Sequence, residues 1–151
     1  MRETKYGRYI IENDSGRPKS DCRDDDEFQK IMPNISYPVV YLDENVINGG
    51  FYIESMWYHS PSDAQIEAHS HDFDEILGFF GSNPEDYHDL CAEVELWLGD
   101  EKHILNKSCV VFVPKGLVHC PMVIRSVDKP FFHFSGGAAN EYDKTQKNTE
   151  K

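Results

Sequence analysis

The chain has 151 residues, of which 39% are hydrophobic and 13% aromatic, and this is the length and composition of one globular domain. Its formal net charge of −12 argues against a nucleic-acid partner, because phosphate binding needs clustered Lys and Arg and the sequence has no such cluster. No apolar stretch approaches membrane-spanning length, the first residues are polar and the four cysteines are scattered. These features predict a cytoplasmic protein with reduced thiols and without a membrane partner.

The chain divides into three segments. Residues 1–33 are charged and turn-rich, and we interpret them as a short N-terminal extension. The acidic run from Asp24 to Glu27 favours a short helix through Met32, because carboxylates stabilise a helix N-terminus. Residues 34–137 are expected to form one β-domain without internal repeats. Residues 138–151 are polar, lack apolar periodicity and are predicted to be a disordered tail.

The middle segment is a series of short strands separated by turns. Residues 93–98 alternate strictly, with Val94, Leu96 and Leu98 on one face, and Gly99-Asp100 predicts a hairpin turn after them. Almost no helical periodicity is present, so the pattern predicts an all-β fold, a closed sandwich or barrel. The other predicted strands are residues 37–42, 51–58, 65–71, 75–80, 102–105, 109–113, 119–125 and 131–135.

His69 and His71 are two residues apart, so in a strand both imidazoles project from the same face and can reach one ion. Glu75 has the same parity, but a continuous strand would place it about 13 Å beyond His71 at roughly 3.3 Å per residue. The chain must therefore bend between them, and residues 72–74 supply turn formers. This bend is also acidic, which favours a cation and disfavours a multiply anionic substrate unless a basic group compensates.

His119 follows a tight turn fixed by Pro114 and Gly116 in a distant segment. One histidine alone is more often a hydrogen-bonded or exposed imidazole than a ligand. The joint spacing, H-x-H-x-x-x-E and then P-x-G-x-x-H on a β-rich chain, is instead a strong indication of a metal site. Imidazole and carboxylate donors suit iron or manganese, and also nickel, zinc or copper.

These two motifs resemble those of the cupin superfamily. His69, His71, Glu75 and Gly81 are similar to its first motif, and Pro114, Gly116 and His119 to its second, over roughly residues 51–135. The resemblance implies a cupin-type double-stranded β-helix, or jelly-roll barrel. It implies that one divalent transition metal lies inside, held by His69, His71, Glu75 and His119.

The chain departs from the family pattern at turn and peripheral positions. Asp63 and Ser108 stand where the motifs begin with glycine, Val123 stands where the second ends with asparagine, and Gly81 comes one residue early. None of these positions is a ligand, so the ligand assignment is unchanged.

The resemblance implies a metal-dependent enzyme that acts on a small organic molecule, of the dioxygenase, isomerase, lyase or decarboxylase type, with iron or manganese favoured. Two alternatives are a non-catalytic module that binds a small molecule or metal, and a barrel that a metal only braces. The catalytic residues are not identified. His133, Arg125 and Tyr58 are candidates for the substrate pocket, although a histidine in an aromatic run is more often structural and an arginine at a strand end more often lies at the surface.

Cupins commonly pair through their outer strands, and a homodimer is therefore expected here. The aromatic residues Tyr52 and Trp97 are predicted to be exposed and to form its interface. Cys120 is adjacent to His119 and is predicted to point the other way, into core packing.

Overall fold

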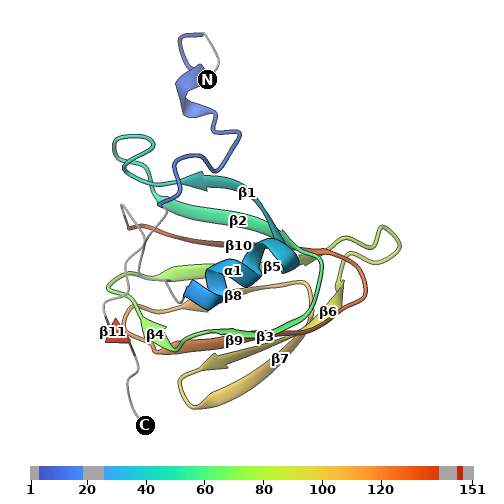
Figure 1. The fold of residues 1–151 in the computed structure, drawn as a ribbon. Helices are drawn as coiled ribbons and strands as arrows, with labels where there is room; N and C mark the ends of the chain where they lie inside the picture. The colour runs from blue at the N-terminus through green and yellow to red at the C-terminus, as the bar shows by residue number, and fades with distance from the viewer. Residues whose placement is uncertain (1–3, 19–25, 140–145, 148–151) are drawn as a thin grey trace.

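The computed structural model describes residues 4–18, 26–139 and 146–147. Most of them form two antiparallel β-sheets that face one another (Figure 1). The prediction of an all-β barrel with jelly-roll pairing is therefore confirmed. The strands are β1 (Ser36–Leu42), β2 (Tyr52–Tyr58), β3 (Ser62–Ile66), β4 (His69–Ser70), β5 (Glu75–Gly81), β6 (Asp89–Leu98), β7 (Glu101–Lys107), β8 (Cys109–Val113), β9 (His119–Val127), β10 (Phe131–Gly137) and β11 (Gln146–Lys147).

The two sheets join strands that lie far apart in the sequence. One sheet has the order β1-β2-β10-β5-β8, and the other has the order β11-β4-β9-β6-β7 with β3 also paired to β9. Because β10 lies between β2 and β5, Ser135 is directly opposite Glu54 on one side and Leu77 on the other. Side chains from three distant segments therefore meet in one row on the wall of the barrel.

The barrel interior is filled by alternate residues of the strands. The buried side chains of β2 include Tyr52, Glu54, Met56 and Tyr58. Phe51, the residue just before β2, is 66% exposed. This is the period-2 pattern of a strand with one face in the core. The most completely buried apolar side chains of the core are Phe79, Leu90, Val94, Leu96 and Phe131.

Two helices precede the strands, the 3-10 helix η1 (Gly7–Tyr9) and α1 (Asp26–Ile35). Helix α1 contacts β1 of one sheet and β3 of the other, and it lies across the side of the barrel in Figure 1. Met32 and Ile35 on α1 are part of the hydrophobic core. The predicted helix is present but runs three residues beyond Met32, and the predicted domain boundary at residue 33 falls inside it. Asp24 and Asp25 lie outside the described residues.

Two expectations about the chain ends and strands are corrected. Gln146–Lys147 form β11 against Ser70 and His69 of β4, so this part of the predicted disordered tail is a strand. The predicted strand at residues 65–71 is instead two strands, β3 and β4, interrupted at Glu67-Ala68. The interruption lets the chain pass from the edge of β9 near Ile124 to the start of β9 at His119.

The outer face of the first sheet is unusually aromatic. Phe134 lies flat over Gly78, where an added Cβ would come within 2.2 Å of its ring. Phe80 stacks on Phe134 at a centroid distance of 6.1 Å, and Trp57 meets Phe132 edge-on at 5.4 Å. The exposed apolar side chains of this face include Ile53, Trp57, Ile76, Phe80, Val110 and Phe112.

The two aromatic residues predicted for a dimer interface are not both at the surface. Tyr52 is buried, because it shares the inward parity of Glu54 and Met56, and its hydroxyl lies 2.6 Å from Oγ of Ser135. That expectation for Tyr52 is wrong. Trp97 is half-buried, and its indole Nε1 donates to Glu95 at 3.0 Å.

Two further observations concern the described residues only. None of their helices has the length and apolar character needed to cross a membrane. Cys91, Cys109 and Cys120 are free thiols, and Cys120 is buried in the core, as predicted.

Candidate metal centre

The three predicted histidines lie together inside the barrel. His69, His71 and His119 are almost completely buried, and their candidate ligand nitrogens all lie within 4.8 Å of one another. His69 and His119 are directly opposite on β4 and β9, with ring centroids 4.4 Å apart. One ion about 2.1 Å from each nitrogen can take all three donors after small ring rotations. The cluster could therefore hold a metal ion.

Glu75 completes this group from the facing sheet. Its Oε1 lies 3.1 Å from Nε2 of His119 and 3.4 Å from Nε2 of His71. Burial alone would raise the pKa of Glu75, but its contacts with His119 and His71 outweigh this effect and lower the pKa to about 2. The side chain is therefore a carboxylate at neutral pH, and it carries the negative charge that a bound cation needs.

Backbone carbonyls determine the tautomers of two histidines. Nδ1 of His69 lies 2.6 Å from the carbonyl oxygen of Glu67, and Nδ1 of His119 lies 3.0 Å from that of Leu117. A carbonyl only accepts, so each Nδ1 carries the hydrogen and donates it. In the neutral form of each ring, the lone pair is then on Nε2. This is how metal-ligating histidines are usually oriented.

The bend predicted between His71 and Glu75 is present, and the second motif is bonded to it. The amide of Lys115 donates to Oδ1 of Asp74 at 2.8 Å, and Nζ of Lys115 lies 3.1 Å from Oδ1 of Asp72. Phe73 stacks on the ring of His71 at 4.8 Å. Because this aromatic ring covers one side of His71, it limits the orientations that the imidazole can take.

His133 and Tyr58 also lie inside the barrel, in an aromatic cluster further from the histidines. Nδ1 of His133 donates to the carbonyl oxygen of Gly78 at 2.9 Å, and its ring packs on Phe79 and Tyr58. Burial lowers the pKa of His133, and this effect outweighs the opposing hydrogen bond to Gly78. His133 is therefore a neutral interior histidine.

Arg125 does not lie with these residues. Its guanidinium is about half exposed, and it forms an ion pair with Glu95 of β6, with Nη2 2.8 Å from Oε1. Its neighbour Ile124 is the one that faces the core. The shared parity with His119 did not determine its direction, because the pairing of β9 with β6 shifts register between His119 and Met122, which reverses the residues that face inward. A second shift lies at Arg125 itself, between Ile124 and Ser126.

Sequence reasoning missed a second charged pair in the interior. Nε of Arg17 lies 3.3 Å from Oε2 of Glu54, whose side chain is buried on the inward face of β2. The available signal was the parity of Glu54, which places a carboxylate on the same face as Met56 and Tyr58. No periodicity indicated that Arg17, from the segment before the barrel, would reach it.

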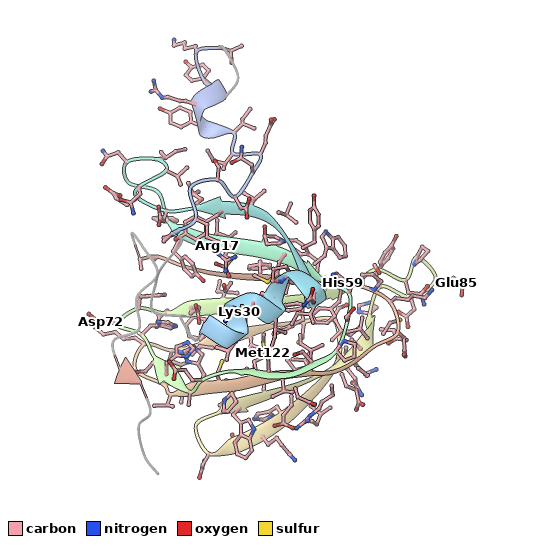
Figure 2. The ribbon with its side chains drawn as sticks, viewed as in Figure 1. Arg17, Lys30, His59, Asp72, Glu85 and Met122 are labelled. Carbon is pink, nitrogen blue, oxygen red and sulfur yellow. The ribbon has the colours of Figure 1, made fainter. Side chains whose placement is uncertain are left out.

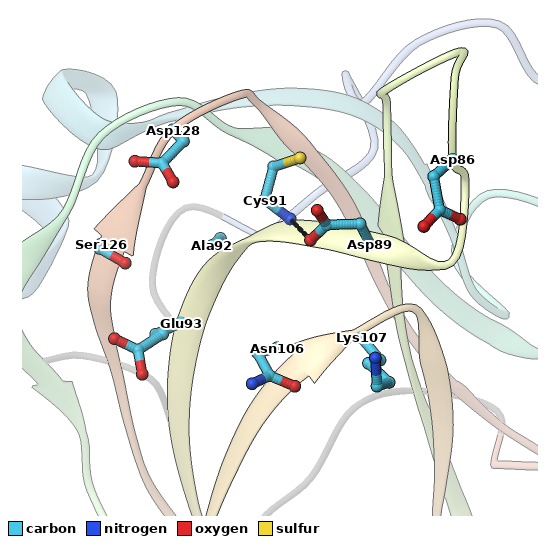
Figure 3. A pocket seen from close by; sticks show the side chains of 9 residues that line it. All are labelled: Asp86, Asp89, Cys91, Ala92, Glu93, Asn106, Lys107, Ser126 and Asp128. Carbon is cyan, nitrogen blue, oxygen red and sulfur yellow. Dashed lines mark hydrogen bonds between the residues drawn. The ribbon is translucent and has the colours of Figure 1, made fainter.

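A separate surface pocket of about 480 Å³ lies between β6, β7 and β9 (Figure 3). Partial burial and the nearby Asp89 raise the pKa of its one cysteine, Cys91, so this thiol is not activated as a nucleophile. The pocket shares no residue with the histidine cluster. Its lining residues are Asp86, Asp89, Cys91, Ala92, Glu93, Asn106, Lys107, Ser126 and Asp128.

No family model matches the sequence, and no curated protein does. Solved structures do share its architecture. An uncharacterised conserved protein with a double-stranded β-helix domain from Klebsiella pneumoniae matches with a TM-score of 0.50 at 17% identity, over 80% of this chain and 89% of that one. KdgF from Halomonas sp. matches at 0.43 and 16% identity, over 70% and 81%. An RmlC-like cupin from Shewanella frigidimarina matches at 0.44 and 12%, over 69% and 75%.

These likenesses concern the fold, and the one with the Klebsiella protein reaches a level that supports a fold assignment. The chain has a double-stranded β-helix fold, as the two motifs predicted. Within that barrel, the histidine cluster is a site that could hold a metal ion.

Proposed function

We propose that the protein is a divalent-metal-dependent enzyme that acts on a small organic molecule, with His69, His71, Glu75 and His119 as the metal ligands. One observation carries this proposal. In the neutral form of the His119 ring Nε2 holds the lone pair, because Nδ1 donates to Leu117, and this Nε2 lies 3.1 Å from a carboxylate oxygen of Glu75. Two acceptors at this distance repel each other unless a proton or a cation lies between them. A divalent ion satisfies both atoms, and also His69 and His71.

The donor set favours iron or manganese, because it combines imidazole with a hard carboxylate. When bound, such an ion supplies Lewis-acid or redox chemistry to a small molecule. The chain's own residues orient the site: the carbonyls of Glu67 and Leu117 fix two imidazoles, and Phe73 restrains a third. The proposed reaction is that of a dioxygenase, isomerase, lyase or decarboxylase. The proposed location of the protein is the cytoplasm.

The test compares metal-loaded protein with a metal-free preparation and with His119→Ala. Each is incubated with a defined mixture of small carboxylates, sugars and keto acids, and compound loss is followed by NMR beside oxygen uptake. We expect metal-dependent loss of at least one compound by the loaded protein, and none by the variant. Binding without turnover would instead indicate a non-catalytic module. A loss of melting temperature on metal removal, with no ligand binding, would indicate a metal that only braces the barrel.

We also propose that two copies of the chain pair through the aromatic outer face of the first sheet. This face carries Trp57, Phe80 and Phe112, each more than a third exposed, on β2, β5 and β8 of one continuous sheet. A second copy offers the same uncharged surface. Because the net charge of the chain is −12, two copies repel each other least where their contacting faces carry no charge. The proposed interface therefore replaces the one expected at Tyr52 and Trp97.

A further inference from the structure

Arg17 pairs with a buried carboxylate, that of Glu54 on the inward face of β2. Among the lysines and arginines whose side chains the structure describes, it is the only one that is not exposed. Its partner Glu54 is 7% exposed and faces the core. An ion pair in this position loses much of its solvation, and an apolar pair of similar volume is often as stable. A purely structural role therefore gives little reason for charges here.

A defined turn delivers Arg17 to this place. The carbonyl oxygen of Asn13 accepts a hydrogen bond from the amide of Tyr41 on the edge strand β1, at 3.2 Å. The amide of Arg17 then donates to the carbonyl oxygen of Asp14 at 2.9 Å. Gly16 packs so closely that an added Cβ would lie 2.4 Å from Val46. The turn is therefore anchored at the edge of the first sheet, and the arginine reaches round it to Glu54.

The strand register places this pair beside the metal centre. Glu54 is opposite Ser135 on β10, and the next inward row contains Tyr52 and Glu75, both opposite Gly137. Two strand spacings and two residues separate Glu54 from Glu75, on the order of 12 Å between Cα positions. Figure 2 shows Arg17 toward the end of the barrel that carries Asp72 and away from Glu85.

Contacts between side chains link the same two places. Ser135, the neighbour of Glu54, shares a hydrogen bond of 2.6 Å with the hydroxyl of Tyr52. Tyr52 meets Phe73 edge-on at 6.3 Å, and Phe73 stacks on His71. These contacts therefore form a continuous chain of side chains from Ser135, beside Glu54, to His71.

The guanidinium keeps donors for such a molecule. It faces Glu54 with its Nε and Nη2 edge, at 3.3 and 3.5 Å, which is longer than the usual 2.7–2.9 Å of charge-assisted hydrogen bonds. Of its five N–H groups, the pair uses two, and the Nη1 end retains the forked geometry that suits a carboxylate. Glu54 therefore holds and orients Arg17 without saturating it.

We propose that Arg17 is a substrate-binding residue that takes a carboxylate of the substrate, while another group of the same molecule faces the metal. This assignment rests on the proposed metal-dependent function. A divalent ion and Arg17 bring three positive charges, and Glu75 and Glu54 bring two negative ones, so neutral histidines leave one positive charge. That positive charge attracts an anionic substrate, and Arg17 supplies the basic group that the acidic bend at residues 72–74 requires.

The test uses Mn²⁺-loaded protein and dicarboxylates from malonate to adipate as probes, with butyrate as the monocarboxylate reference, by calorimetry. We expect one dicarboxylate length to bind more tightly than butyrate. Arg17→Gln should weaken that dicarboxylate about tenfold or more, since charged hydrogen bonds are lost, and leave butyrate unchanged. Arg125→Gln is the matched control, because its arginine pairs with Glu95 on the outside, and it should change neither.

A second variant separates binding from folding. Arg17→Gln removes the positive charge that faces the buried Glu54 and should lower the melting temperature, whereas Arg17→Gln with Glu54→Gln should restore stability but not dicarboxylate binding. Wild-type affinity in the double variant, or equal affinity of every dicarboxylate and butyrate, would overturn the proposal. Mn²⁺ uptake is measured first: no uptake by the wild type overturns the proposed function, and normal uptake without an Arg17 effect overturns this inference alone.

Discussion

The amide of Gly116 donates to the carbonyl oxygen of His71 at 2.9 Å, so the turn before His119 is bonded to the segment that carries the first two histidines. This one hydrogen bond joins the two sequence motifs across the barrel. The hydrogen bond depends on the backbone conformation of Gly116, whose φ is +85°. A residue with a side chain adopts this φ only with strain.

Gly116→Ala should therefore weaken metal binding without adding a steric clash, since no atom lies within 4 Å of the new Cβ. We expect a loss of about 1 kcal/mol in the free energy of unfolding and a severalfold loss of Mn²⁺ affinity by calorimetry. Gly49→Ala is the matched control, because Gly49 also has an open Cβ direction and a φ of +82°. It should lose similar stability and keep its Mn²⁺ affinity, and an equal loss of affinity in both variants would contradict the prediction.

Removal of a histidine donor should abolish the stabilisation that the metal provides. For the wild type, metal at about 100 times its Kd should add about 2.7 kcal/mol to the free energy of unfolding. His119→Ala should show little of this gain in thermal melting with and without Mn²⁺, and a chelator should have little effect on it. His103→Ala, at an exposed histidine of β7, should respond to metal as the wild type does.

Acid should destabilise the metal-free protein partly through His133. Its pKa is lowered in the folded state, so below the ordinary histidine pKa of about 6.5 the unfolded chain binds the extra proton. The stability is thus fully present above about pH 6.5 and is lost as the pH falls, with a slope of at most about 1.4 kcal/mol per pH unit. His133→Gln should remove this part of the slope in urea unfolding at several pH values. His59→Gln, at an exposed histidine, should not.

The proposed dimer should dissociate when a charge enters the aromatic face. Phe112 is 59% exposed on β8, and Phe112→Glu in both copies would place two carboxylates in an apolar interface. Sedimentation should find a dimer for the wild type and a monomer for this variant. Ile104→Glu is the control, because Ile104 is 46% exposed on β7 of the other sheet. A wild-type monomer at high concentration would remove the proposal.

The barrel and the histidine cluster were predictable because both depend on local periodicity. Alternation fixes which side of a strand is buried, and the spacing of His69 and His71 fixes their common direction. The bend before Glu75 followed from distance alone. Parity was less reliable beyond an irregularity: one register shift of β9 lies between His119 and Arg125, and Arg125 faces outward instead of into the site.

Other features depended on contacts that no local pattern records. Tyr52 was assigned to the surface because its strand alternates two aromatic faces, and only the pairing of β2 with β10 decides which of them is inside. The strand at Gln146–Lys147 depends on β4 having an open edge. Arg17 lies outside both motifs, and its partner is 37 residues away.

The turn that carries Arg17 has a consequence for how this protein can change. The proposed metal donors are on strands and bends of the barrel, whereas Arg17 comes from a separate segment that is hydrogen-bonded to the edge strand β1. In the proposed function, the residues that bind the metal and the residue that selects the ligand therefore lie in different segments of the chain. Replacing residues 13–17 with a turn of another length or charge would change which ligands the barrel binds and leave the proposed metal donors unchanged. This turn is therefore the segment to vary in a library of variants selected for new ligands.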